Sequence, residues 1–255
     1  MAKKHTSRLL IAIGLFASFA MIVMGVSARK FGLFSRSQAV QPRVTNKTQS
    51  VRISNVRRLD SGDVEIIWTN QSTNAIYAYT LVTNERPTRK GVTTFLTGAP
   101  AEPGESKSER IPEQNIKSGA AITSDGAGEI IFSALYLEGG IAEGDQRDSE
   151  KLKRTMGGMK EQAKLVLGVL RDAGSSPEQD SGRLLDAIEL QIASLSIKDK
   201  SAPASKERDD GKAMVNDRLL DAVKRLRVKR ANAGVDVRTE LAELITYYER
   251  LATKL

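Results

Sequence analysis

The sequence predicts a multi-segment α+β protein: an N-terminal apolar helix, then an antiparallel β-sandwich, then C-terminal α-helical hairpins. Three observations carry this prediction. Residues 9–28 contain no charge, residues 50–141 contain short alternating runs between turn residues, and residues 147–255 contain apolar side chains at helical spacing. We therefore divide the chain into a signal peptide or membrane anchor, a linker, the sandwich and a region of about four helices. These parts are residues 1–28, 29–49, 50–146 and 147–255.

The apolar segment from Leu9 to Ala28 has twenty uncharged residues. This length suffices for a helix that crosses the hydrocarbon core of a membrane. The segment also has the layout of a secretory signal, because basic residues precede it and Val26-Ser27-Ala28 is a cleavage motif with small residues. Without cleavage the chain contacts the membrane through Leu9–Ala28 and its C-terminal part lies outside the cytoplasm. Cleavage after Ala28 makes it a secreted or periplasmic protein of the cell envelope.

Composition excludes several common chemistries. The chain has no cysteine, and its one histidine, His5, precedes the apolar segment. The exported part therefore has no disulfide, thiolate zinc site, Ser-His-Asp triad or histidine base. Small exported domains often rely on disulfides, so their absence favours a bacterial protein. The net charge of +8 permits contact with anionic lipids or polymers without indicating nucleic acid.

Short strands are predicted after a polar linker in which Ser, Thr, Asn and Gln dominate residues 30–49. The strands are rich in β-branched and aromatic residues, and Gly- or Pro-containing turns separate several of them. The turns include Asp60–Asp63 and Pro103–Ser106. Regularly spaced short strands of this kind are typical of an antiparallel sandwich. The predicted strands are Val51–Val56, Val64–Thr69, Ala75–Thr83, Val92–Leu96, Lys107–Ile111 and Glu129–Leu137.

A resemblance rests on the strand Ile76–Thr80, the turn Pro103–Ser106 and the segment Glu138–Asp145 after the last strand. In this order they resemble immunoglobulin-like domains of uncharacterised exported bacterial proteins. The resemblance covers about residues 50–146, and it implies a fold and a compartment but no activity. The Cys pair of antibody domains is missing, and Trp68 is the only candidate for a core tryptophan.

The C-terminal region predicts amphipathic helices that pack as hairpins or as a short coiled coil, because apolar residues recur in steps of three and four. Gly157-Gly158 interrupts the first helix, and residues 198–212 are predicted to be a flexible connection. Helices of this length need to bury their apolar faces on each other, on the sandwich or on a partner. The first predicted helix begins by Leu152 and ends at Gly174–Pro177, and the second runs from Pro177 or Asp180 to about Ile197. The third runs from about Ala213 to Ala231 and the fourth from Val235 to Lys254.

A basic run on the third of these helices is the one candidate binding site: Lys224, Arg225, Arg227, Lys229 and Arg230. It would contact an anionic surface, namely a lipid headgroup, a cell-wall polymer or a nucleic acid, and export makes nucleic acid the weakest choice. The alternative, which we favour, is a solvated helix face with Asp217 and Asp221 as ion-pair partners.

Two other features have a functional and a structural interpretation. Carboxylates and glycines at residues 138–145 would suit Ca²⁺, but the structural interpretation is a strand-to-helix junction with Asp145 or Asp148 as the helix cap. Tyr77, Tyr79 and Tyr136 would form an exposed binding strip, but we expect two of the three to be core residues or to form cross-strand pairs. We predict no catalytic residue, no cofactor and no metal site.

The sequence therefore predicts an exported or membrane-anchored, non-catalytic envelope protein that binds an unknown protein or envelope polymer. A second hypothesis is a structural scaffold that forms homo-oligomers through the C-terminal helices. A carboxylate-based hydrolase ranks third, because no spacing in the sequence selects a catalytic pair. We expect the chain not to be an enzyme.

Overall fold

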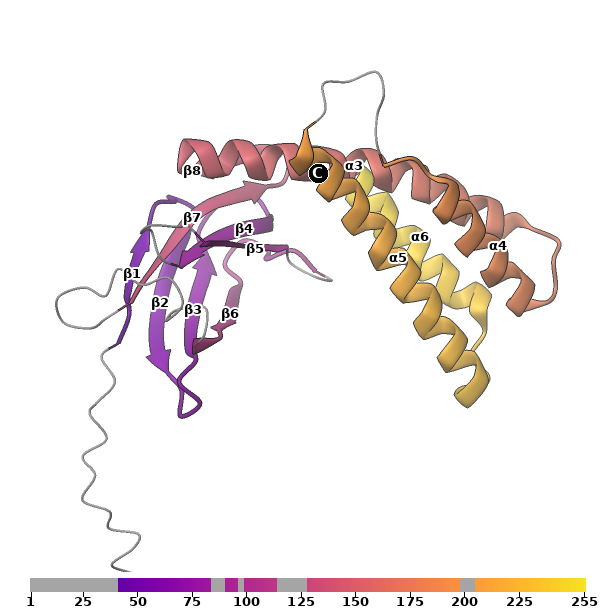
Figure 1. Cartoon of the computed structure of the whole chain (residues 1–255), viewed down its shortest axis with the longest axis horizontal. Coiled ribbons are helices and arrows are strands. Elements are labelled where there is room, and N and C mark those ends of the chain that lie inside the picture. Colours follow the sequence, from indigo (N-terminus) through magenta and orange to yellow (C-terminus); the bar gives the residue numbers. More distant parts are fainter. Residues whose placement is uncertain (1–40, 84–89, 96–98, 114–127, 198–204) are drawn as a thin grey trace, which may run out of the picture. The chain divides into compact units, whose positions relative to one another are not determined.

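Eight strands and four helices make up the described part of the chain. The computed structural model describes residues 41–83, 90–95, 99–113, 128–197 and 205–255, and residues 41–255 form one compact unit (Figure 1). The apolar segment Leu9–Ala28 lies outside the described residues.

The larger sheet is mixed, with the strand order β1-β7-β4-β5 and β8 beside β7. β1 runs parallel to the first half of β7, and β8 runs antiparallel to the second half. β4 pairs antiparallel with both β7 and β5. The strands of the larger sheet are β1 (Arg43–Asn46), β4 (Ile76–Thr83), β5 (Lys90–Phe95), β7 (Glu129–Leu137) and β8 (Ile141–Gly144).

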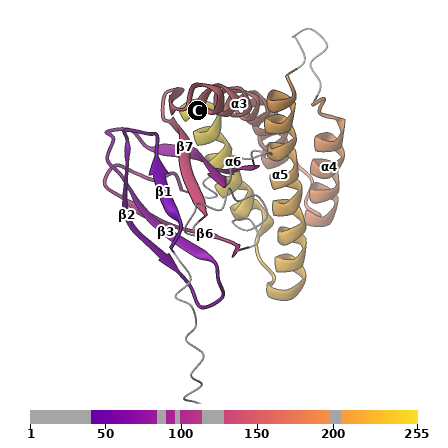
Figure 2. The same cartoon turned by 60° about the vertical axis from the view of Figure 1, so that its left-hand side comes forward.

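The smaller sheet is antiparallel, with the order β2-β3-β6, and consists of β2 (Val51–Arg58), β3 (Val64–Asn70) and β6 (Ser106–Ile111). Every second residue of β3 is buried, as its alternating sequence predicts. The buried side chains join a core shared with β4 and β7. Figure 2 shows the ribbons of β2 and β3 on the side of the molecule away from α4 (Ser181–Ser194) and α5 (Lys206–Ala233). Trp68 lies at the centre of this core, with ring centroids 5.3 Å from Tyr79 and 5.7 Å from Phe132. The expectation that Trp68 is a core residue is confirmed.

The prediction of an antiparallel, immunoglobulin-like sandwich is wrong. The first strand of the larger sheet, β1, pairs parallel with β7 and lies within residues 29–49, which had been assigned to the linker. The other face of this sheet is covered by the helices at β4 and β7, because Ala78, Ala134 and Tyr136 belong to the core of the helical region. Helices and sheet thus share a core, and the chain is an α+β structure without an independent sandwich.

The prediction of an N-terminal apolar helix also finds no support. Its residues lie outside the described ranges, and within those ranges every helix is too short or too polar to cross a membrane.

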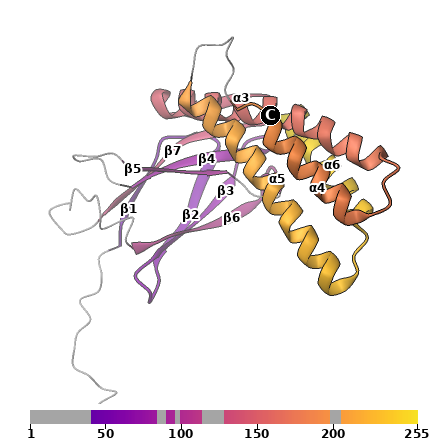
Figure 3. The same cartoon turned by 45° about the vertical axis from the view of Figure 1, so that its right-hand side comes forward.

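The four helices begin at side-chain caps. Asp145, Asp180, Ser205 and Asp236 each accept a hydrogen bond from a backbone N–H in the first turn of the helix that follows. Asp145 thereby confirms the predicted strand-to-helix junction. Figures 1 and 3 show α4, α5 and α6 running beside one another, with α3 packed along all three. The helices are α3 (Gln146–Ser175), α4 (Ser181–Ser194), α5 (Lys206–Ala233) and α6 (Val237–Lys254).

The predicted interruption at Gly157-Gly158 does not occur, since α3 continues without a break to Ser175. Gly158 instead allows α5 to approach. A Cβ atom on Gly158 would lie 2.1 Å from the backbone oxygen of Arg208, and one on Gly211 would lie 2.1 Å from that of Thr155. The two backbones therefore touch where α3 crosses α5, and glycine is needed on both helices. α5 also begins at Lys206 inside the predicted connection, because Ser205 caps it.

The junction between β8 and α3 depends on Gly144. This residue has φ +108°, and a Cβ atom there would lie 2.1 Å from the backbone oxygen of Ser133. The next residue, Asp145, donates its N–H to the same oxygen at 2.8 Å. The Ser133 hydroxyl donates to the Asp148 carboxylate in the first turn of α3, and both residues are buried. These contacts hold the start of α3 against the larger sheet.

We expect Gly144→Ala to lower the free energy of unfolding of residues 41–255 by about 2–4 kcal/mol, because it adds a clash to an unfavourable backbone conformation. Urea unfolding followed by circular dichroism measures the change. Gly104→Ala is the matched control, since Gly104 has φ +79° but no atom within 4 Å of its Cβ position. Equal losses at the two positions would show that the contact with Ser133 contributes nothing.

Candidate functional site

A pocket of about 600 Å³ lies between the larger sheet and the helices α3, α5 and α6. This volume is within the range of pockets that bind small molecules. Its wall on the strand side is formed by Tyr77 of β4, by Pro100 and Glu102 in the loop before β6, and by Glu138 after β7. Residues of three helices form the other walls, so the pocket exists only when sheet and helices are packed together.

One face of α6 forms the longest wall of the pocket. The residues that line it are spaced by three and one in alternation, which places them on the same side of a helix. This face has one carboxylate, one hydroxyl, one phenol, two cations and one apolar side chain, from Glu243, Thr246, Tyr247, Arg250 with Lys254, and Leu251 in that order. The floor is apolar, because Met156 and Met159 of α3 are buried beneath it.

The last turn of α6 is held on the turn between β7 and β8. The Tyr136 hydroxyl donates to the backbone oxygen of Leu255 at 2.9 Å, and the N–H of Gly139 donates to that of Lys254 at 3.1 Å. The Lys254 ammonium lies 2.6 Å from a carboxylate oxygen of Glu138, which raises the pKa of Lys254. These bonds fix the pocket-lining face of α6 relative to the sheet.

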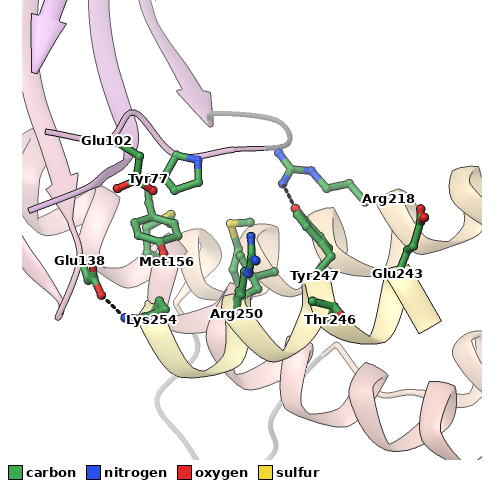
Figure 4. A pocket seen from close by; sticks show the side chains of 13 residues that line it. Tyr77, Glu102, Glu138, Met156, Arg218, Glu243, Thr246, Tyr247, Arg250 and Lys254 are labelled. Atoms are coloured by element: carbon green, nitrogen blue, oxygen red, sulfur yellow. Dashed lines mark hydrogen bonds and ion pairs between the residues drawn. The ribbon is translucent and has the colours of Figure 1, made fainter. Parts of the chain in front are cut away.

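Arginine and tyrosine side chains alternate across the pocket. In Figure 4 Arg250 stands between Tyr77 and Tyr247, and the guanidinium of Arg218 donates to the Tyr247 hydroxyl at 3.4 Å. Burial raises the pKa of Tyr77, with a smaller contribution from the Glu138 carboxylate, so its phenol stays protonated. The pocket therefore offers guanidinium and phenol donors above an apolar floor.

A second hollow of about 360 Å³ adjoins this pocket between α5 and α6. Arg218 and Tyr247 line both spaces, so these two side chains lie at the border between them. The second hollow also contains Arg225, which lies two helical turns beyond Arg218 on α5. Of the five cations predicted from the sequence, Arg225 is the one that lines either of these two cavities.

The other four nominated cations are paired with carboxylates. Lys224 lies 3.8 Å from Asp221 on its own helix, as the favoured interpretation expected. The remaining three join α5 to neighbouring elements: Arg227 to Asp186 and Glu189, Lys229 to Glu240, and Arg230 to Asp180. These ion pairs fasten α4 and α6 to α5 and neutralise most of the basic run.

The other sequence features have structural roles. Tyr79 and Tyr136 are buried and Tyr77 is half-buried, so the expectation of two core tyrosines is confirmed. Glu143, in the segment considered for Ca²⁺, accepts hydrogen bonds from the backbone of Gln49 and Ser50 at 3.1 and 2.8 Å. Among the described residues no cluster of carboxylates or histidines has the arrangement of a metal site.

We expect the stability of residues 41–255 to fall as the pH rises above about 10, where tyrosines of the unfolded chain ionise. Burial raises the pKa of Tyr77, Tyr136 and Tyr248 in the folded chain. A raised pKa means that the folded chain favours the neutral phenol. Its contribution to stability is fully present below the pKa of the phenol in the unfolded chain, and it is lost as the pH rises through the pKa in the folded chain. The urea concentration at the unfolding midpoint should fall less steeply with rising pH in Tyr248→Phe than in the unaltered chain. An unchanged slope would contradict the role of burial.

No protein-family model, curated protein or solved structure matches the chain.

Proposed function

We propose that the chain is a non-catalytic binding protein of the cell envelope, delivered there by the apolar segment Leu9–Ala28, and that its ligand occupies the pocket beside α6. The observation that carries the proposal is the combination of an apolar floor, Met156 and Met159, with the exposed charged side chain of Arg250. Convergent polar groups above apolar side chains are typical of ligand-binding pockets. The side chain of Arg250 has no ion-pair partner within the described ranges, so it is available to a ligand.

The alternative of an oligomeric scaffold has less support. The apolar faces of α3, α5 and α6 are already buried against one another. The large apolar side chains that remain exposed on the helices are Leu165, Leu190 and Val228, at 51%, 75% and 59%. Single exposed apolar residues are common on monomeric proteins.

The test has a cellular and a molecular arm. Fractionation with N-terminal sequencing should find the chain in the envelope, beginning near Arg29 if it is cleaved or at its original N-terminus in the membrane if it is not. Native mass spectrometry of the purified full chain should then detect a bound small molecule. We expect Thr246→Trp, which fills the pocket, to lose this molecule.

The control is Ala242→Trp, since Ala242 is exposed on the same helix but does not line the pocket. A chain found in the cytosol with an intact N-terminus would contradict the location. A bound molecule that both variants retain, or its absence from the unaltered chain, would contradict the binding site.

A further inference from the structure

We infer that the ligand of the pocket is an amphiphile with an acidic head group, a carboxylate or a phosphate joined to an apolar chain. This inference rests on the proposed binding function. It depends on which charged side chains of the two adjoining cavities already form an ion pair within the protein and which do not.

Three guanidinium groups line the cavities without a carboxylate partner among the described residues: Arg218, Arg225 and Arg250. Arg227 and Arg230 on α5 and Arg171 on α3, by contrast, form ion pairs with carboxylates. Three guanidinium groups that form no ion pair thus line the space where a ligand would lie. Guanidinium binds carboxylate and phosphate with two parallel hydrogen bonds, which makes it the usual recognition group for both anions.

The acidic side chains of the cavities compensate this charge only in part. The Glu138 carboxylate forms an ion pair with the Lys254 ammonium at 2.6 Å, and the Asp221 carboxylate forms one with the Lys224 ammonium at 3.8 Å. Glu102 and Glu243 remain, both exposed and without an ion pair in the described part of the chain. The two cavities together therefore contain three guanidinium groups without an ion pair and two carboxylates without one, and Arg218 is the one charged residue that lines both.

The apolar part of the ligand follows from the floor. Met156, Met159 and Leu251 are buried beneath the larger cavity, and Ala222 and Leu244 contribute apolar atoms to the smaller one. A free anion would make no use of the apolar part of this lining. Methionine side chains adapt to irregular apolar groups, which suits a flexible chain better than a rigid ring. An acidic head held by the arginines and an alkyl chain over the methionines would satisfy both surfaces.

The methionines allow a site-specific test on the full chain kept soluble in an amphipathic polymer. Isotope-labelled methionine methyl groups are followed by NMR during titration with octanoate, octyl phosphate, octanol, octylammonium, acetate and inorganic phosphate. We expect octanoate or octyl phosphate to shift the Met156 and Met159 signals in a saturable way, while Met214, which does not line the pocket, stays unchanged. Comparison of the two acids identifies the head group, and acetate and phosphate should bind much more weakly.

Arg250→Gln and Arg218→Gln should each weaken this binding about tenfold, the effect of losing one charge-assisted pair. Arg183→Gln is the matched control, because Arg183 is exposed on α4 outside both cavities. If octanol or octylammonium binds as well as octanoate and octyl phosphate, or if the arginine variants bind normally, the acidic head group is refuted while the pocket remains a binding site. If no compound shifts Met156 and Met159, both the inference and the proposed binding site are refuted.

Discussion

Gly158→Ala is expected to lower the free energy of unfolding of residues 41–255 by roughly 2–3 kcal/mol, although alanine normally favours a helix. The added methyl group would lie 2.1 Å from the backbone oxygen of Arg208, so α3 and α5 would have to separate. The same crossing brings Gln162 and Asn216 together in a buried hydrogen bond of 2.8 Å. Separation of the helices would strain this bond as well. Urea unfolding followed by circular dichroism measures the loss.

The adjacent residue provides the control. Gly157 lies in the same turn of α3 but has no atom within 4 Å of its Cβ position. Gly157→Ala should therefore raise stability by about 0.5–1 kcal/mol, the usual gain for this change inside a helix. Gly211→Ala should resemble Gly158→Ala, and the double variant should lose less than the sum, because both changes widen one crossing. Similar effects at Gly157 and Gly158 would show that the helices do not need the close approach.

Trp68→Ala should have the largest effect on stability, a loss of about 3–5 kcal/mol. The indole is fully buried between the sheets, where its edge meets the rings of Tyr79 and Phe132. Its removal leaves a cavity at the point where both sheets meet, and the surrounding rings cannot close it. Circular dichroism during urea unfolding is the suitable measurement, because Trp68 is the only tryptophan and fluorescence would be lost with it.

Trp68→Phe should lose only about 1–2 kcal/mol, since an aromatic ring remains in the core. The indole N–H has no hydrogen-bond partner among the described residues, so its replacement removes no such bond. Leu190→Ala is the surface control, because Leu190 is 75% exposed and should change stability by no more than about 0.5 kcal/mol. A loss at Trp68→Ala no larger than at Leu190 would mean that the two sheets do not depend on their shared core.

The elements were easier to predict than their arrangement. Strand β3 alternates along its length, and α6 repeats apolar residues every three or four positions, so both were found close to their observed bounds. Strand β1 was missed because it has four residues and lies in a polar segment. The parallel pairing of β1 with β7 cannot be recognised in the hydrophobic pattern of the segment itself. This pairing is one reason the predicted sandwich is wrong.

Close packing explains the error at Gly157-Gly158. Helix propensity alone disfavours two consecutive glycines, and a sequence contains no direct sign of a second backbone that needs the space. The outcome also depends on Ser205, which starts α5 early enough for Arg208 and Gly211 to reach the crossing. Tertiary contact therefore overrides a local preference here.

The candidate site was largely beyond sequence reasoning. Tyr77, Glu138, Met159 and Lys254 are far apart in the chain, and the pocket exists because β4, β7, α3 and α6 bring them together. Periodicity placed Met159 and Leu251 on apolar faces but could not show that they form the floor of a cavity. The basic run contained the useful residue Arg225, yet nothing in the sequence distinguished it from its neighbours, whose charges are used in contacts with carboxylates.

The parallel pairing of β1 with β7 sets a temporal order for folding. Thr45 of β1 is hydrogen-bonded to Glu129 of β7 at a separation of 84 residues, and Tyr136 is bonded to Leu255 at a separation of 119. In a chain that emerges from its N-terminus, whether from a ribosome or a translocation channel, β1 and one edge of β4 stay unpaired until β7 follows. The contact between Tyr136 and α6 cannot form before Leu255 has emerged. Such distant pairings make folding slow, so we expect the native state to form late and nearly all at once.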